Sequence, residues 1–261
     1  MATPEQQLHK AVRGNDLPTV ESLLASGVPI NCLFYGWTPL QLAIENGLQE
    51  MAVFLLEKGC DAKQHDKNTK SPFEEAMLKK QAKVVEALVN SGVSATQAMS
   101  SGDSALCFAV ELDCLDLVQV LLNGNADPNS INKRNETAVF IASQEGEIDI
   151  LKELVKKGAD VNCVHRDNNN FTPLIAAVAN DNEEAVKILV QSKADVNAQD
   201  GDGWTPLWHA YSNSNEEISE VLLHAGALTD TVNSEGKTVV QEANENEDDD
   251  FIALFNKFKR V

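Results

Sequence analysis

A short motif recurs along this chain at a nearly fixed interval. It starts with Thr or Ser, carries an apolar residue two positions later, and its successive copies are 33 or 35 residues apart. The copies begin at Thr38, Ser71, Ser104, Thr137, Thr172, Thr205 and Thr238. An alanine lies five residues after each start, and an aliphatic pair lies seventeen and eighteen residues after every start but the last. A period of this length predicts a stack of similar units, because one unit of this size cannot bury its apolar face alone.

Each position of the motif has a role in a helix. A Thr or Ser hydroxyl can accept from a free N–H of the first helical turn, and Pro suits the next position because no N–H is needed there. The aliphatic pair indicates a second helix, and most units follow it with a glycine suited to a left-handed helix end. Lys193 holds that glycine position in one unit, where we expect about 1 kcal/mol of backbone strain.

This pattern resembles that of the ankyrin-repeat family, whose signature includes Thr-Pro-Leu-His-x-Ala at a period of 33 residues. The resemblance covers nearly the whole chain and implies an all-α solenoid of stacked helix-turn-helix units with hairpin-like loops. Leu8, Ala11 and the pair Leu23 and Leu24 fit the template ahead of the first motif, so we expect eight units in a single domain. The expected units are residues 1–32, 33–65, 66–98, 99–131, 132–166, 167–199, 200–232 and 233–261.

The charge of the chain restricts its partners. Lysine and arginine number 21 against 40 aspartates and glutamates, which gives a net charge of −19. Such a field repels phosphate, so it argues against binding to nucleic acid and to anionic membranes. It favours instead a protein partner that carries a basic patch.

The cysteines and the start of the chain indicate a location inside the cell. The five cysteines include no Cys-x-x-Cys pair, and an odd number of them fits a reducing compartment. The first residues carry no signal-peptide pattern, and no run of 18 apolar residues occurs. We therefore expect an intracellular protein, in the cytoplasm and with the nucleus as a second location.

No motif of known catalytic chemistry occurs in the sequence. The chain lacks a glycine-rich phosphate loop, a Gly-x-Ser-x-Gly elbow and a His-Glu-x-x-His pair, and its five histidines are scattered over four units. We expect a monomer that is not an enzyme and that holds neither a cofactor nor a metal.

The family resemblance implies that a partner meets the loop tips and the exposed ends of the first helices. Several aromatic residues fall at these positions although Phe, Trp and Tyr make up only 5% of the chain. They are Phe34, Tyr35, Trp37, Phe171 and Trp204. Exposed aromatics are typical anchors of protein interfaces. The alternative is structural: the residues before each N-cap fasten the loop to its neighbour, and a shortened loop folds Phe34 and Tyr35 inward.

Lysines also cluster at the expected loop positions of the third unit. Lys67, Lys70 and Lys79 precede or follow its motif, with Lys80 beside them. We include the first three in the predicted partner surface; the alternative is an ordinary solvated face.

Two asparagines lie in a pattern similar to the one that an asparaginyl hydroxylase recognises in ankyrin repeats. Asn162 follows Asp160 and Val161, and Asn197 follows Asp195 and Val196, each with a leucine eight residues before it. We predict hydroxylation of Asn162 and Asn197. The structural interpretation, which is compatible with this modification, is that the side chains bond the turn.

The function predicted from these features is protein binding, as a scaffold, adaptor or inhibitor, through the concave face and the loop tips. One alternative is a small-ligand or nucleotide sensor. The ankyrin part of the interferon-induced ribonuclease binds an oligoadenylate through a tryptophan in a Gly-Trp-Thr-Pro-Leu context, which is similar to residues 36–40 here. Another alternative is that the chain is the targeting fragment of a larger protein.

Overall fold

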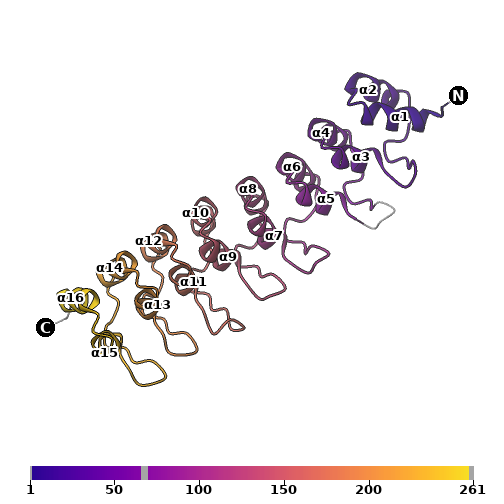
Figure 1. The fold of residues 1–261 in the computed structure, drawn as a ribbon. Coiled ribbons are helices and arrows are strands. Elements are labelled where there is room, and N and C mark those ends of the chain that lie inside the picture. Colours follow the sequence, from indigo (N-terminus) through magenta and orange to yellow (C-terminus); the bar gives the residue numbers. More distant parts are fainter. Residues whose placement is uncertain (1, 66–69, 259–261) are drawn as a thin grey trace. The chain divides into compact units, whose positions relative to one another are not determined.

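The computed structural model describes residues 2–65 and 70–258, which form sixteen α-helices and no strand (Figure 1). The chain divides into two compact units, Met1–Asp127 and Pro128–Val261. The first contains α1 (Pro4–Arg13), α2 (Leu17–Ala25), α3 (Pro39–Glu45), α4 (Gln49–Glu57), α5 (Pro72–Leu78), α6 (Ala82–Asn90), α7 (Ala105–Glu111) and α8 (Leu115–Asn123). The second contains α9 (Ala138–Glu145), α10 (Ile148–Lys156), α11 (Pro173–Ala179), α12 (Glu183–Gln191), α13 (Pro206–Ser212), α14 (Glu216–His224), α15 (Val239–Glu245) and α16 (Asp249–Lys257). The all-helical fold predicted from the repeat is confirmed.

Each compact unit has two layers of helices. In the first, α3 packs against α1 and α5, while α6 packs against α4 and α8. In the second, α11 packs against α9 and α13, while α12 packs against α10 and α14. Within each unit the long loops between successive helix pairs project from the same side (Figure 1). The loops therefore form a row of tips next to the ends of the first helices.

The motif residues have the positions that their chemistry predicts. Each motif Thr or Ser is an N-cap whose side chain accepts from the backbone N–H three residues later, as Thr38 does from Gln41 at 3.1 Å. The prolines of four motifs occupy the first helical position. The alanines five residues after each motif start have no exposed surface. Because alanine is small, it lets neighbouring first helices approach closely.

The helix ends contain the predicted left-handed residues. Asn125 has a φ of 64° and Lys193 a φ of 67°, at the position that glycine fills in five other repeats. A side chain with a Cβ is strained in this region by about 1–2 kcal/mol. The Lys193 side chain is exposed, so no packing contact offsets this strain.

Replacing Lys193 with glycine is expected to raise the free energy of unfolding by several tenths to about 1 kcal/mol. Glycine adopts a positive φ without the Cβ clash, and the change removes no buried group. Urea denaturation followed by circular dichroism measures the effect. A Gly158→Ala variant is the matched control, since Gly158 has a φ of 85° at the equivalent position and should lose stability. An unchanged or lower stability of the Lys193→Gly variant would contradict the assignment of strain.

Candidate functional site: an aromatic turn and an aromatic hollow

The loop before α3 is a tight hairpin that presents Tyr35 at its tip. The backbone N–H of Phe34 donates to the Trp37 carbonyl at 3.0 Å, and the Trp37 N–H donates to the Phe34 carbonyl at 3.1 Å. The two residues between them, Tyr35 and Gly36, have φ values of 51° and 82°. This is the geometry of a type I′ turn, which strongly favours Asn-Gly at its centre.

Tyr35 points into solvent, contrary to the alternative in which the shortened loop folds it inward. Its side chain is 81% exposed, and its ring packs edge-on against Phe34 with centroids 4.4 Å apart. Phe34 is half-buried, and its ring packs against the ring of His9 on α1 with centroids 5.5 Å apart. The Nε2 atom of His9 in turn lies 2.9 Å from the Trp37 carbonyl oxygen. The turn is thus fixed to α1 while its tip is free.

A hollow of about 290 Å³ lies beside this turn. The turn supplies Phe34, Tyr35 and Trp37 to its lining, α1 supplies His9 and Arg13, and α3 with its C-cap supplies Leu42, Glu45 and Asn46. The structure therefore brings three of the predicted site residues together. We name Phe34, Tyr35 and Trp37 the aromatic turn.

The lysines of the predicted surface are placed among carboxylates. The Lys79 Nζ lies 3.2 Å from Glu45 and 3.4 Å from Glu75, and the Lys70 Nζ lies 3.3 Å from Glu75. Lys67 lies outside the described residues. The Glu45 contact joins α3 to the end of α5, so Lys79 connects two successive repeats.

Phe171 and Trp204 lie in the second compact unit and meet through a histidine. The ring of His209 packs against the rings of Phe171 and Trp204, and its centroid lies 5.3 Å from each of theirs. The Nε2 atom of His209 is 2.9 Å from the buried carboxylate of Asp200. The same carboxylate accepts from the Trp204 backbone N–H at 2.9 Å, so Asp200 holds both partners of this contact.

Sequence reasoning missed the residues that extend this aromatic group along α13. Trp208 stacks on Trp204 with centroids 5.4 Å apart, and Tyr211 lies one helical turn further on. Trp208 and Tyr211 are three positions apart, which is the spacing of one helix face, whereas Trp204 precedes the N-cap Thr205. That spacing was the available signal. The repeat signature obscures it, because Trp208 stands where that signature has histidine.

Asn162 and Asn197 bond the next repeat rather than their own turn. The Asn162 Oδ1 accepts from the Asp195 N–H at 2.8 Å, and the Asn197 Oδ1 accepts from the Leu228 N–H at 2.8 Å. Their own turns are closed by the preceding aspartates, as Asp160 accepts from the Asn162 N–H at 2.9 Å. Asn162 is exposed and Asn197 is half-buried.

Within residues 2–65 and 70–258, no three His, Cys, Asp or Glu side chains gather as metal ligands would. None of the helices there is long and apolar enough to cross a bilayer.

A family model of three ankyrin repeats matches residues 8–99, 53–132 and 106–200, and a model of a single ankyrin repeat matches residues 202–234. The chain belongs to the ankyrin-repeat family. Ankyrin repeats are in general modules of protein–protein interaction, and their fold is typically non-catalytic. The family predicted from the motif spacing is therefore confirmed.

This ankyrin-repeat protein is similar to a solved structure and, over a short segment, to a known enzyme. The crystal structure of the ankyrin repeat domain of Bcl-3, described as a unique member of the IkappaB protein family, superimposes with a TM-score of 0.68. It is 25% identical in sequence and covers 80% of this chain and 94% of that domain. The 2-5A-dependent ribonuclease of Mus musculus is 35% identical over 71 residues. That match spans 26% of this chain and only 10% of the ribonuclease.

Proposed function

We propose that this protein is a non-catalytic binding module, a scaffold, adaptor or inhibitor, that anchors its partner on the aromatic turn. The observation that carries the proposal is the exposure of Tyr35 in a left-handed backbone conformation. An exposed tyrosine at this position costs about 1–2 kcal/mol of backbone strain and gains little burial in return. Tyrosine is, however, among the residues that most often dominate the binding energy of an interface.

The geometry of the turn supports this role. The paired hydrogen bonds of Phe34 and Trp37 fix the turn, and the contacts with His9 fix Phe34. A partner that meets a fixed turn does not lose free energy to ordering the loop. The adjacent hollow gives the partner a concave surface next to a projecting ring. The net charge of −19 favours a partner with basic residues around the contact.

The Tyr35→Asn variant separates binding from folding. Asparagine is preferred at this turn position, so we expect the free energy of unfolding to stay the same or rise by up to about 1 kcal/mol. Loss of an aromatic anchor is expected to raise the dissociation constant of the complex with the partner by about tenfold or more. Affinity capture from a cell lysate, quantified by mass spectrometry, identifies the partner, and titration with the purified partner gives the affinity.

Val164 provides the matched control, because it is also an apolar residue of a loop and is 50% exposed. The Val164→Ser variant should retain the partner. Equal capture of every partner by the native protein and by the Tyr35→Asn variant would overturn the proposal.

A nucleotide ligand is the second candidate, favoured by the identity to part of the 2-5A-dependent ribonuclease. The pairing of Lys79 with Glu45 and Glu75 argues against it, since a polyanion would have to displace these carboxylates. Titration of the tryptophan fluorescence with 2′,5′-linked oligoadenylates tests it. A saturable change at micromolar concentration would favour this candidate over protein binding.

We also propose hydroxylation of Asn162 and Asn197 by an asparaginyl hydroxylase. Both side chains lie in turns within the long loops between successive helix pairs, and their repeats share the leucine eight residues upstream. Because Asn162 is exposed and Asn197 is half-buried, we expect Asn162 to be modified to the greater extent. Peptide mass spectrometry after incubation with such an enzyme should show one added oxygen on each. Absence of added oxygen on both peptides would reject this proposal, and the Asn162→Ala variant is the control for site assignment.

A further inference from the structure

A second hollow lies in the Pro128–Val261 unit, along α13 and next to the last helix pair. It measures about 330 Å³. Its lining includes Trp204, Trp208, Tyr211, Glu242, Asn246 and Asp248. The hollow therefore combines aromatic rings from α13 and its loop with carboxylates from α15 and the start of α16.

The aromatic wall is rigid. Trp208 is 3% exposed and stacks on Trp204 with an interplanar angle of 25°. Tyr211 packs edge-on against Phe251 with centroids 5.0 Å apart. Stacked indoles carry a negative quadrupole on their faces, which attracts cations. A wall of this kind favours a cation over an anion.

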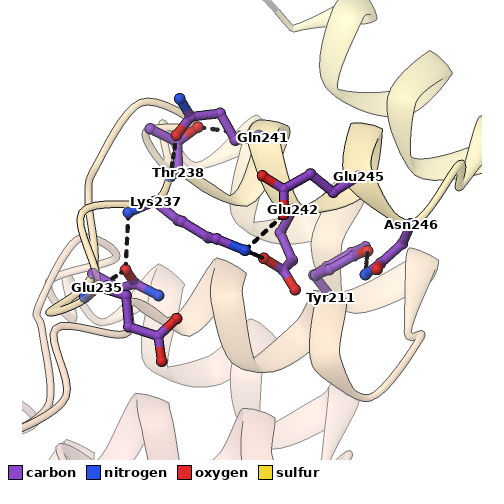
Figure 2. Close-up of polar contacts among 9 residues, drawn as sticks. Tyr211, Glu235, Lys237, Thr238, Gln241, Glu242, Glu245 and Asn246 are labelled. Atoms are coloured by element: carbon purple, nitrogen blue, oxygen red, sulfur yellow. Dashed lines mark hydrogen bonds and ion pairs between the residues drawn. The ribbon is translucent and has the colours of Figure 1, made fainter.

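Two polar groups at the wall indicate an incomplete site. The indole Nε1–H of Trp208 is buried and has no acceptor among the described residues. The Tyr211 Oη accepts from the Asn246 side-chain amide at 2.9 Å (Figure 2), and its own proton has no hydrogen-bond acceptor among the described residues. A buried donor without an acceptor is destabilising. A ligand with a carbonyl group next to its cation would supply an acceptor for the Tyr211 hydroxyl.

The charge around the hollow is strongly negative. Residues 235–250 contain seven acidic residues and one lysine, a net charge of −6. The lysine, Lys237, lies 2.7 Å from Glu245 and 3.1 Å from Glu242 (Figure 2), and these hydrogen bonds raise the pKa of Lys237. One cation therefore already sits against Glu242, and the acidic residues around it still outnumber it.

Asp248 carries the remaining charge of the lining. Its Oδ1 accepts from the Phe251 N–H at 3.3 Å and caps α16. Its Oδ2 makes no hydrogen bond to the described part of the chain. This oxygen is an unused acceptor for a cation.

We propose that this hollow binds the cationic side chain of a lysine or arginine in a basic segment of a partner protein. The ammonium or guanidinium group lies against the indole wall and pairs with Asp248, and a backbone carbonyl of the segment accepts from the Tyr211 hydroxyl. The site is separate from the aromatic turn, and the inference does not depend on the function proposed there.

The test reads the indole N–H signals of the whole 261-residue chain by NMR. The chain has three tryptophans, so tryptophan labelled with ¹⁵N gives three signals, which Trp→Phe variants assign. The probes are short capped peptides with a central lysine or arginine, and matched peptides with acetyl-lysine or citrulline. We expect the cationic peptides to shift the Trp204 and Trp208 signals saturably, while the Trp37 signal stays in place. The neutral peptides should cause no shift.

The Asp248→Asn variant tests the role of the charge without loss of the cap, because Asn is as good an N-cap as Asp. We expect it to weaken binding by about fivefold or more, since a charge-assisted contact is lost. The Glu216→Gln variant removes the same charge from an exposed position on α14 and should bind as the native protein does. Equal weakening of binding by both variants would show that the overall negative charge, and not Asp248, attracts the peptides, which would overturn the proposal. Binding of the neutral peptides, or an absence of shifts with the cationic peptides, would also overturn it. The Tyr35→Asn variant should leave this titration unchanged, which keeps a failure here distinct from a failure at the aromatic turn.

Discussion

Replacing Phe140 with alanine is expected to lower the free energy of unfolding by about 3–5 kcal/mol. Phe140 lies on α9, is 1% exposed, and its ring packs edge-on against His165 with centroids 5.0 Å apart. Truncation removes apolar contacts and leaves a cavity in the buried core, where α9 packs against α10 and α11.

The effect can be measured in the compact unit that contains the change. Trp204 and Trp208 lie in the same unit as Phe140, so a Trp37→Phe background reports its unfolding by fluorescence in urea. The Phe140→Leu variant is the control and should lose less than about 1.5 kcal/mol, because leucine fills most of the volume. A loss below about 1 kcal/mol for the alanine variant would show that the site collapses around the smaller side chain.

The second large effect is expected at Asp200. Its Oδ1 accepts from the backbone N–H groups of Asp202 and Trp204, each at 2.9 Å, and its Oδ2 lies 2.9 Å from the His209 Nε2. The Asp200→Ala variant leaves these donors without their acceptor in a part-buried loop. We expect a loss of about 2–4 kcal/mol and a displaced Trp204.

The Asp200→Asn variant retains the Oδ1 acceptor and should lose less than half of what the alanine variant loses. Urea denaturation gives the stability, and the position of the Trp204 indole signal shows whether the loop keeps its geometry. Similar losses for both variants would mean that the contact with His209, rather than the loop, accounts for the effect.

The parts of this fold that the sequence predicts are those set by local chemistry. The N-caps from Thr38 to Thr238, the prolines after them and the left-handed Lys193 each depend on a few neighbouring residues. These features repeat with the period of the chain, so one correct assignment fixes the others.

The contacts between successive repeats could not be predicted in the same way. The pairing of Lys79 with Glu45 joins residues 34 positions apart, and its geometry depends on how two helix pairs pack. The outward position of Tyr35 depends on the backbone of the shortened turn, which composition does not determine. The hollow beside Tyr211 could not be predicted for a similar reason, since the contact of Tyr211 with Asn246 depends on how the last helix pair packs against α13.

The bonds from each asparagine to the next repeat have a consequence for how such a chain diversifies. Asn31, Asn129, Asn162 and Asn197 each accept from a backbone N–H of the following turn, at Asp61, Asp160, Asp195 and Leu228. In these four turns the acceptor is an asparagine, whereas any residue except proline can supply the N–H, as the leucine at 228 illustrates. A repeat can therefore be duplicated, exchanged or given new surface residues without a compensating change in its neighbour. The same hydrogen bond can thus connect repeats of different sequence, which leaves the exposed loop tips open to selection for new partners.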